Sequence, residues 1–565
     1  MNQIMNFLRI LFIWIVCVSF TAAENEQLSQ EDHVQLTPEI TLTGEKYSCE
    51  RCLSKSGYVY YGIRYGVAKR FEHAEENHDF SYFSNPDRPK QGYVCPQHVT
   101  ALPGFPLRNL TLNEDCLYLD VYVPSVKQST KDKKLPVLFF IHGGGFQIGD
   151  KDLYNATELA GAVNAVVVTI NYRVFAFGFL SSGDGAIKGN YGIGDAKVAL
   201  KWVKKNVAKF GGDPEAITVF GESAGGALTS AVFLDKDVRE SVRAGIAMSG
   251  SMLSSWSVNR AAKIGYDTVA KELGCLNASQ AEVVQCLKDA PMEKLLKVTE
   301  FIGKNFTMWF MFAPVIDGEH VTEPPAQMIS KQKQSESKRE GTFITGFLRE
   351  DSSLLMMLAQ RDLFLPNSTF DFHVAKKIVT DNARLMHPCN LTDTVEQILR
   401  YYKLAENDDR PTTMRKTYHI VTDLTFGFPA IQEARVYANR SFSSEVHNQL
   451  YRISYDPNYN GLGSFHGLDL ILLFHGPIKV LMANHTVDNE IIDNFRNMFH
   501  QVAHNGHLEG PNAGAGYVEF GQSGKWETGT EDFNDLSQFW TKQIENARSC
   551  ATPPQLKDAA STKSA

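Results

Sequence analysis

The sequence lacks any large cluster of positive charge and, beyond its first residues, any long apolar run. Its 565 residues carry a formal net charge of -8, without a basic arm or an aromatic-basic cluster. The electrostatic footprint of a nucleic-acid-binding protein is therefore missing. No later run approaches the roughly 20 apolar residues that a membrane-spanning helix needs. We expect neither a nucleic-acid partner nor a membrane span. The content of 43% hydrophobic and 21% charged residues is typical of a packed globular protein.

The first residues resemble an export signal. Arg9 precedes an apolar run over residues 10–20, and the small residues of Thr21-Ala22-Ala23 follow. This pattern predicts a signal peptide over residues 1–23 that is cleaved after Ala23. Residues 24–550 are then expected to form a single domain, and residues 551–565 a polar C-terminal tail without a hydrophobic anchor or an ER-retention ending. We therefore predict that the protein is secreted and extracellular.

Glycosylation sequons become meaningful once export is predicted. We expect some of the Asn-x-Ser/Thr sites to carry glycans, and which of them do so is left open. The candidates are Asn109, Asn155, Asn277, Asn305, Asn367, Asn390, Asn439 and Asn484.

The cysteines also fit an exported chain. Of nine cysteines, eight remain after Cys17 in the signal segment is removed, and an even number suggests disulfides. Cys49 and Cys52 have the spacing of a redox motif, but no thioredoxin-like strand and helix surround them, so structural pairing is favoured. No metal site is predicted. The eight are Cys49, Cys52, Cys95, Cys116, Cys275, Cys286, Cys389 and Cys550.

Short apolar runs alternate with helical patterns. Residues 135–141, 165–173 and 216–221 are rich in β-branched and aromatic side chains, as buried strands are. Between the last two lies a helix with one apolar face. This order predicts right-handed crossovers, a largely parallel sheet, and a ligand site at the carboxyl ends of the strands. Later runs at residues 243–250, 342–347 and 450–456 predict further strands.

The most specific motif is the string GESAGG, residues 221–226, which follows a predicted strand and opens an alanine-rich helix. This context predicts a nucleophile elbow with Ser223 at its tip. Small flanking residues allow the tight turn, and the helix N-terminus favours developing negative charge. A serine in this place needs a histidine base and a carboxylate that orients it.

A second glycine-rich motif, HGGGF at residues 142–146, follows the strand predicted over residues 135–141. Backbone N–H groups of such a turn complete an oxyanion hole together with the residue after the nucleophile. Gly144, Gly145 and Ala224 are the predicted donors.

Together these motifs resemble the type-B carboxylesterase/lipase family, which includes the cholinesterases. The resemblance rests on the two glycine motifs and on EDCLYLDVYVP from Glu114, NYRVFAFGFL from Asn171 and GNYGIGDAKVALKWVKKNVAKFGGDP from Gly189. It is dense over residues 95–256 and ordered but patchier beyond. It implies an α/β-hydrolase fold, with a large, mostly parallel central sheet flanked by helices and with helical insertions over the active site.

The resemblance also implies the other members of a catalytic triad. The family's His-Gly-x-Glu/Asp string falls on His466 in HGLD, whereas His475 and His142 lack that string. The acidic member falls on Asp351, where the family usually has glutamate. The neighbouring Glu350 stays open as an alternative.

Further roles follow only from the resemblance. Ser249 matches a hydroxyl that supports the triad carboxylate. Trp256 falls where relatives place an aromatic of the acyl pocket, which would favour short acyl groups, although a place in the core is equally open. The implied disulfides are Cys95–Cys116 and Cys275–Cys286, and the pairing of Cys49, Cys52, Cys389 and Cys550 is left open.

The predicted function is that of a serine esterase that hydrolyses carboxylic esters through an acyl-enzyme, without a cofactor. Its substrate is a small-molecule or lipid ester. The loop from Cys95 to Cys116 lacks the tryptophan of cholinesterases, and Glu222 stands where juvenile hormone esterases usually have glutamine, so a general carboxylesterase is preferred over both. A non-catalytic adhesion or binding protein and a lipase acting on acylglycerols are the alternatives. The physiological ester and the oligomeric state are left open.

Overall fold

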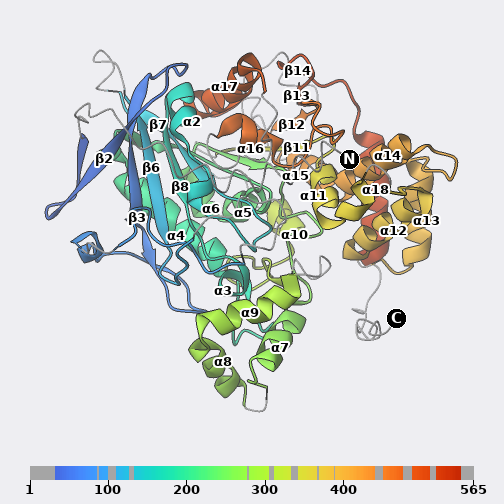
Figure 1. Ribbon diagram of the computed structural model, residues 1–565, viewed down its shortest axis with the longest axis horizontal. Helices are drawn as coiled ribbons and strands as arrows, with labels where there is room; N and C mark the ends of the chain where they lie inside the picture. The colour runs from blue at the N-terminus through green and yellow to red at the C-terminus, as the bar shows by residue number, and fades with distance from the viewer. Residues whose placement is uncertain are drawn as a thin grey trace.

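A computed structural model describes most of the chain, including the strands of a central sheet (Figure 1). The described residues are 32–84, 88–98, 110–125, 133–276, 279–303, 311–331, 341–365, 368–386, 388–438, 449–474, 487–508 and 517–548. The predicted signal peptide and C-terminal tail, His475 and Cys550 lie outside these ranges.

At the core of the molecule, the residues in these ranges form a 12-stranded sheet in the order β1-β2-β3-β6-β8-β7-β9-β10-β11-β12-β13-β14. In this order the strands from β8 to β13 run parallel to one another, and antiparallel strands extend the sheet at both edges. The parallel strands are β8 (Val166–Ile170), β7 (Leu135–Ile141), β9 (Gly212–Glu222), β10 (Ala244–Met248), β11 (Thr342–Leu348), β12 (Gln449–Ile453) and β13 (Val518–Phe520). The others are β1 (Asp32–Thr37), β2 (Ile40–Ser48), β3 (Ser56–Arg64), β6 (Tyr118–Pro124) and β14 (Trp526–Thr528), and a separate pair is formed by β4 (Gly66–Val67) and β5 (Glu75–Glu76).

Helices cover both faces of the sheet. Successive side chains of a strand point to opposite faces, and the apolar residues on each face are buried against helices. In β7, Val137 and Phe139 join the apolar cluster of α4 and α5, whereas Leu138 and Phe140 join that of α2, α16 and α17. The helices on the first face are α4 (Tyr191–Asn206) and α5 (Ala224–Phe233), and those on the second are α2 (Thr157–Val163), α16 (Leu468–Leu473) and α17 (Asn489–Asn505).

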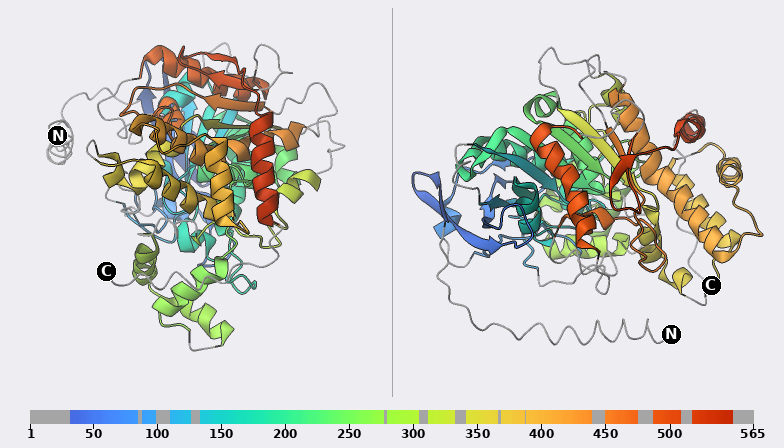
Figure 2. Two further views of the ribbon diagram at one scale, coloured as in Figure 1. Left: turned by 90° about the vertical axis from the view of Figure 1, so that its right-hand side faces the viewer. Right: turned by 90° about the horizontal axis from the view of Figure 1, so that it is seen from above.

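Two groups of helices project from this sandwich (Figures 1 and 2). The first contains α7 (Ala262–Glu272), α8 (Gln280–Asp289) and α9 (Met292–Gly303). The second surrounds its own apolar cluster and contains α11 (Ser352–Ala359), α12 (Phe372–Ala383), α13 (Leu391–Tyr401), α14 (Arg410–Thr422) and α18 (Asn534–Arg548).

Shorter elements connect these layers. The α-helices are α3 (Phe175–Phe179), α6 (Lys236–Ser241), α10 (Pro325–Lys331) and α15 (Phe428–Ala438), and the π-helix η8 (Asp423–Gly427) joins α14 to α15. The 3-10 turns are η1 (Ser81–Ser84), η3 (Lys151–Leu153), η4 (Val207–Phe210), η6 (Arg361–Phe364) and η7 (Arg384–Met386).

The α/β-hydrolase fold predicted from the sequence is confirmed. β7 occupies the predicted residues, and the predicted apolar face of the helix, which includes Trp202 and Val203, is buried. Among the helices in the described ranges, none is long and apolar enough to cross a membrane.

Candidate active site

Ser223 lies at the tip of the turn between β9 and α5. Its φ of 58° and ψ of -122° place a non-glycine residue in a strained region of backbone space. The turn depends on small neighbours, because a Cβ added to Gly225 would lie 2.0 Å from the carbonyl oxygen of Ile141. Ser223 directly precedes the first turn of α5, where N–H groups have no partner within the helix. The turn therefore exposes a hydroxyl beside backbone donors.

His466 and Asp351 meet at the carboxyl ends of the parallel strands. Asp351 follows β11, and His466 lies in the segment between β12 and α16. His466 Nδ1 lies 2.6 Å from Asp351 Oδ1. The other carboxylate oxygen, Oδ2, accepts hydrogen bonds from Ser249 Oγ at 2.7 Å and from the backbone N–H of Leu348 at 3.0 Å. The buried Asp351 is thus held by three donors and orients the imidazole.

Glu350, the alternative acidic residue, faces another way. Its Oε1 lies 3.1 Å from His419 Nε2, and its Oε2 accepts the N–H of Ser464 at 3.1 Å. These contacts tie the segment that carries His466 to α14. The carboxylate next to His466 Nδ1 is therefore that of Asp351.

Glu222 is a neighbour of the predicted base that the sequence reasoning did not assign to the site. Its Oε1 lies 3.1 Å from His466 Nε2, and the side chain is buried. Among the described contacts, no hydrogen bond joins His466 Nε2 to Ser223 Oγ, and such bonds often tighten only when substrate binds. The signal was available, since Glu222 is the residue before the nucleophile in the elbow motif and must share its turn.

The charges of Glu222, Asp351 and His466 alter the pKa values of Glu222 and His466. Burial raises the pKa of Glu222 to about 7, with His466 lowering it and Asp351 raising it further. Burial alone would lower the pKa of His466, but the two carboxylates together raise it to about 9. The imidazole is therefore held in a field that favours its charged form, which is the form it takes after accepting a proton.

The glycine turn after β7 touches the elbow. Gly144 has a φ of 104° and Gly145 a φ of 64°, which L side chains rarely adopt. A Cβ added to Gly143 would lie 3.1 Å from Ser223 Cβ. The predicted donors Gly144 and Gly145 are thus in the turn that packs on Ser223, and the third donor, Ala224, begins α5.

His142, at the start of the same glycine turn, is a core residue. Its ring stacks on Tyr172 with centroids 4.3 Å apart, and burial lowers the pKa of His142 to about 4. A neutral, buried imidazole that packs on an aromatic ring supports the turn rather than acting as the base.

Trp256 is buried between the glycine turn and the histidine. Its ring centroid lies 5.9 Å from those of both Phe146 and Phe426, and its Nε1 donates to the carbonyl oxygen of Thr425 at 3.0 Å. Phe426, on η8, in turn packs on the ring of His466 at 4.9 Å. The sequence did not identify Phe426, because only the folded chain brings η8 beside His466.

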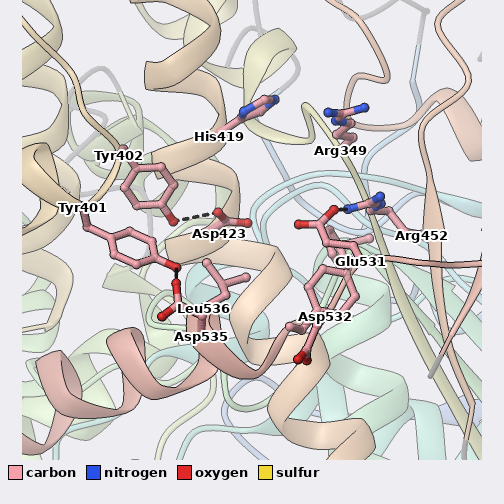
Figure 3. A pocket seen from close by; sticks show the side chains of 12 residues that line it. Arg349, Tyr401, Tyr402, His419, Asp423, Arg452, Glu531, Asp532, Asp535 and Leu536 are labelled. Atoms are coloured by element: carbon pink, nitrogen blue, oxygen red, sulfur yellow. Dashed lines mark hydrogen bonds and ion pairs between the residues drawn. The ribbon is translucent and has the colours of Figure 1, made fainter. Parts of the chain in front are cut away.

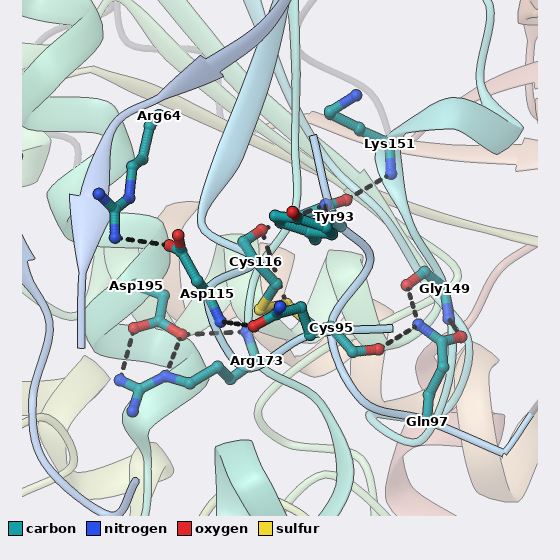
Figure 4. Close-up of a disulfide and its surroundings, with 12 residues drawn as sticks. Arg64, Tyr93, Cys95, Gln97, Asp115, Cys116, Gly149, Lys151, Arg173 and Asp195 are labelled. Carbon is teal, nitrogen blue, oxygen red and sulfur yellow. Dashed lines mark hydrogen bonds and ion pairs between the residues drawn. A yellow bond between two sulfur atoms is a disulfide. The ribbon is translucent and has the colours of Figure 1, made fainter. Parts of the chain in front are cut away.

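The Cys95–Cys116 disulfide anchors the segment beside the glycine turn (Figure 4). Gln97, two residues after Cys95, exchanges two hydrogen bonds of 2.8 Å with the backbone of Gly149. The bridge therefore braces the loop that follows the predicted oxyanion glycines.

The other implied bridge, Cys275–Cys286, is also present, and Cys49 pairs with Cys52. Cys389 is disulfide-bonded as well. Among the predicted glycosylation sites, Asn390 is exposed and caps α13, whereas Asn155 Oδ1 accepts from Thr157. The other six lie outside the described residues.

A polar cavity of about 300 Å³ lies between β11, α14 and the start of α18 (Figure 3). Tyr402 donates to Asp423 at 2.6 Å and Tyr401 to Asp535 at 2.7 Å, while Arg452 is paired with acidic neighbours. Among the described residues that line it, none is a serine, threonine or cysteine. The cavity therefore lacks a nucleophile of the kind that the elbow presents.

Comparisons with known proteins agree with this geometry. A profile described as the carboxylesterase family matches residues 32–551. The chain is 29% identical to liver carboxylesterase 1 of Oryctolagus cuniculus over 354 residues, 61% of each protein's length. It is 28% identical to acetylcholinesterase of Bungarus fasciatus over 488 residues, which is 82% of this chain and 75% of that protein. It is 40% identical to bile salt-activated lipase of Homo sapiens over 229 residues, or 38% of this chain and 30% of that protein.

Proposed function

Since the chain belongs to the carboxylesterase family, we propose that it is a serine hydrolase that cleaves carboxylic esters to an acid and an alcohol. The observation that carries this proposal is the placement of His466, with Asp351 2.6 Å from its Nδ1 and Glu222, which directly precedes Ser223 in the elbow, 3.1 Å from its Nε2. A hydroxyl, a base and a carboxylate in this order are what acyl transfer requires.

The proposed reaction passes through an acyl-enzyme. Ser223 Oγ attacks the ester carbonyl while His466 Nε2 takes its proton, and Asp351 holds the imidazole in the tautomer that can accept it. The N–H groups of Gly144, Gly145 and Ala224 stabilise the negative charge that develops on the carbonyl oxygen. His466 then protonates the departing alcohol. A water molecule, activated by the same imidazole, hydrolyses the acyl-enzyme and releases the acid.

Esters with short acyl groups and acylglycerols are the two candidate substrate classes. The bulky ring of Trp256, close to the glycine turn and to Phe426, supports a preference for short acyl groups. The 40% identity to a lipase over 229 residues favours instead a second candidate, hydrolysis of acylglycerols. A steep rise in rate when the substrate exceeds its solubility would identify the lipase.

We further propose that the protein is exported. The apolar segment at residues 10–20 and the small residues before position 24 support cleavage of a signal peptide. Three disulfides among the described residues fit an oxidising compartment. Edman sequencing of protein collected from culture medium should begin at Glu24.

The test of the esterase proposal is active-site labelling of the secreted protein with a fluorophosphonate, alongside hydrolysis of p-nitrophenyl esters. We expect the label on Ser223 and loss of both labelling and turnover in Ser223→Ala. Ser330→Ala, which changes an exposed serine on α10, should behave as the native protein. Folded native protein that neither labels nor turns over any ester would instead favour a binding function.

A further inference from the structure

Two histidines and a glutamate gather away from the elbow, in a place that no step of the proposed reaction uses. His73 lies between β4 and β5, while Glu319 and His320 lie in the segment before α10. One ligand atom from each of the three side chains can be chosen so that all lie within 4.8 Å of one another. Segments far apart in the sequence thus bring three potential metal ligands together.

Most of the ring nitrogens in this cluster are buried and lack a hydrogen-bond partner. Both nitrogens of His73 and Nε2 of His320 are shielded from solvent without a hydrogen-bond partner. The distance from His73 Nε2 to Glu319 Oε2 is 3.5 Å, which is longer than a good hydrogen bond. Buried polar groups are normally paired, so the unpaired nitrogens point to a ligand that would satisfy them.

We propose that His73, Glu319 and His320 form a binding site for Zn²⁺ with a fourth position open to water. Ligands about 2.1 Å from a tetrahedral zinc ion lie roughly 3.4 Å from one another, close to the 3.5 Å between His73 and Glu319. Imidazole nitrogens together with one carboxylate suit zinc, whereas calcium and magnesium prefer oxygen ligands alone.

The surrounding backbone lets the two imidazole rings come together and shapes the segment that supplies two ligands. Gly194 of α4 faces the cluster, and a Cβ added there would lie 3.2 Å from His320 Nε2 and 3.4 Å from His73 Nδ1. Asp317 Oδ1 accepts the N–H groups of both Glu319 and His320. These bonds hold the two ligand-bearing residues in a tight turn before any ion arrives.

Lys188 occupies one of the three proposed ligands. Lys188 Nζ lies 2.8 Å from Glu319 Oε2, and the two side chains are 52% and 43% exposed. An exposed pair of this kind contributes little to stability. Lys188 can therefore move into solvent when zinc takes its place, and its removal should favour zinc.

A bound ion would clamp a segment that reaches the active site. Residues 311–321 also provide the carbonyl oxygen of Phe312, which accepts from Gln147 of the glycine turn at 3.0 Å. Val315 exchanges two hydrogen bonds with Asn190 at the start of α4. We therefore expect zinc to stabilise residues 311–321 without taking part in the proposed reaction.

Zinc binding can be measured on the full chain, prepared without a histidine tag and stripped with EDTA. Isothermal titration with ZnCl₂ should show one site, and Co²⁺ should give the visible bands of a four-coordinate ion. His73→Ala and His320→Ala should each weaken this binding by at least about 100-fold, since even partners that only support a metal ligand are worth 10- to 100-fold. Lys188→Met, which keeps all three ligands, should bind zinc as tightly as the native protein or more tightly.

A second histidine pair provides the control for non-specific binding. His500 and His504 pack with ring centroids 4.3 Å apart, so His500→Ala shows how much binding belongs there. The proposal is wrong if native protein binds no zinc, or if His73→Ala and His320→Ala leave affinity unchanged while His500→Ala abolishes it. Because the readouts are calorimetric and spectroscopic, they stand whether or not the protein hydrolyses esters.

Discussion

Asp351 and Glu350 are adjacent carboxylates with different surroundings. Asp351 is bonded to His466, Ser249 and Leu348, whereas Glu350 is bonded to Ser464 and contacts His419. Only the first can hold the tautomer of the proposed base. The geometry therefore supports Asp351 as the proposed catalytic partner and gives Glu350 the contacts of a structural brace.

This division predicts unequal effects of two matched substitutions. Asp351→Asn should lower kcat on the order of 10⁴-fold, because an amide favours the wrong imidazole tautomer. Glu350→Gln should change kcat by less than about tenfold, as it removes charge but keeps a polar side chain away from Nδ1. Turnover of a p-nitrophenyl ester measures both, with circular dichroism confirming the fold. Equal losses in the two variants would contradict the assignment.

Glu222 should set the pH dependence of the reaction. His466 must be neutral to accept the serine proton, so activity should rise as pH approaches the His466 pKa of about 9. Glu222→Gln removes a negative charge 3.1 Å from Nε2 and so should lower the pKa of His466. The acidic limb of the kcat/KM profile should then lie at a pH about one unit or more lower than in the native protein. Glu350→Gln is the control, since its carboxylate faces His419. An acidic limb that stays in place in Glu222→Gln would refute this role.

At the scale of elements, the site is assembled by loops that follow parallel strands. β9, β11 and β12 carry Ser223, Asp351 and the His466 segment to one edge of the sheet, as expected for open α/β sheets. The π-helix η8 adds Phe426 against His466. An irregular turn of this kind often marks a functional position, and here it also supplies the acceptor for the indole of Trp256.

Trp256 offers a test of how these elements shape substrate choice. Trp256→Ala should raise kcat/KM for long-chain esters relative to short-chain esters by roughly tenfold or more, because each methylene accommodated contributes about 0.8 kcal/mol. Trp256→Phe keeps most of the bulk but loses the hydrogen bond to Thr425, so it should retain the native preference. A series of p-nitrophenyl esters from acetate to palmitate measures the ratio. An unchanged ratio in Trp256→Ala would assign the indole to the core alone.

For the whole molecule, a buried ion pair supports the antiparallel part of the sheet. The fully buried Lys151 Nζ lies 2.9 Å from Asp120 Oδ2 and 2.5 Å from Asp152 Oδ1. Asp120 also accepts the N–H of Gly62. The pair therefore joins β3, β6 and the turn that follows the glycine motif.

Breaking this pair should destabilise the protein strongly. Lys151→Met leaves the carboxylate of Asp120 buried without its cation, a change that costs about 3 to 5 kcal/mol. Lys188→Met breaks an exposed pair instead and should cost less than about 1 kcal/mol. Guanidinium denaturation gives both free energies of unfolding. If the two variants are equally stable, burial is not what makes the Lys151 pair important.

Resemblance to the carboxylesterase family supplied His466 and Asp351 as the residues proposed to act with Ser223. The sequence alone was enough for six of the parallel strands and for the elbow. These depend on short-range requirements, such as apolar runs that can only be buried strands and small residues around Ser223 that permit a strained turn. It could not choose firmly between Asp351 and Glu350, because adjacent carboxylates differ only in what the chain folds against them.

Only the tertiary structure decided which distant groups become neighbours. It placed Asp351 against His466 and set Phe426 beside the same imidazole. It also gathered His73, Glu319 and His320, which no spacing in the sequence suggests. Local patterns determine elements because backbone geometry repeats over a few residues, whereas side-chain contacts between remote segments exist only once all the elements have packed.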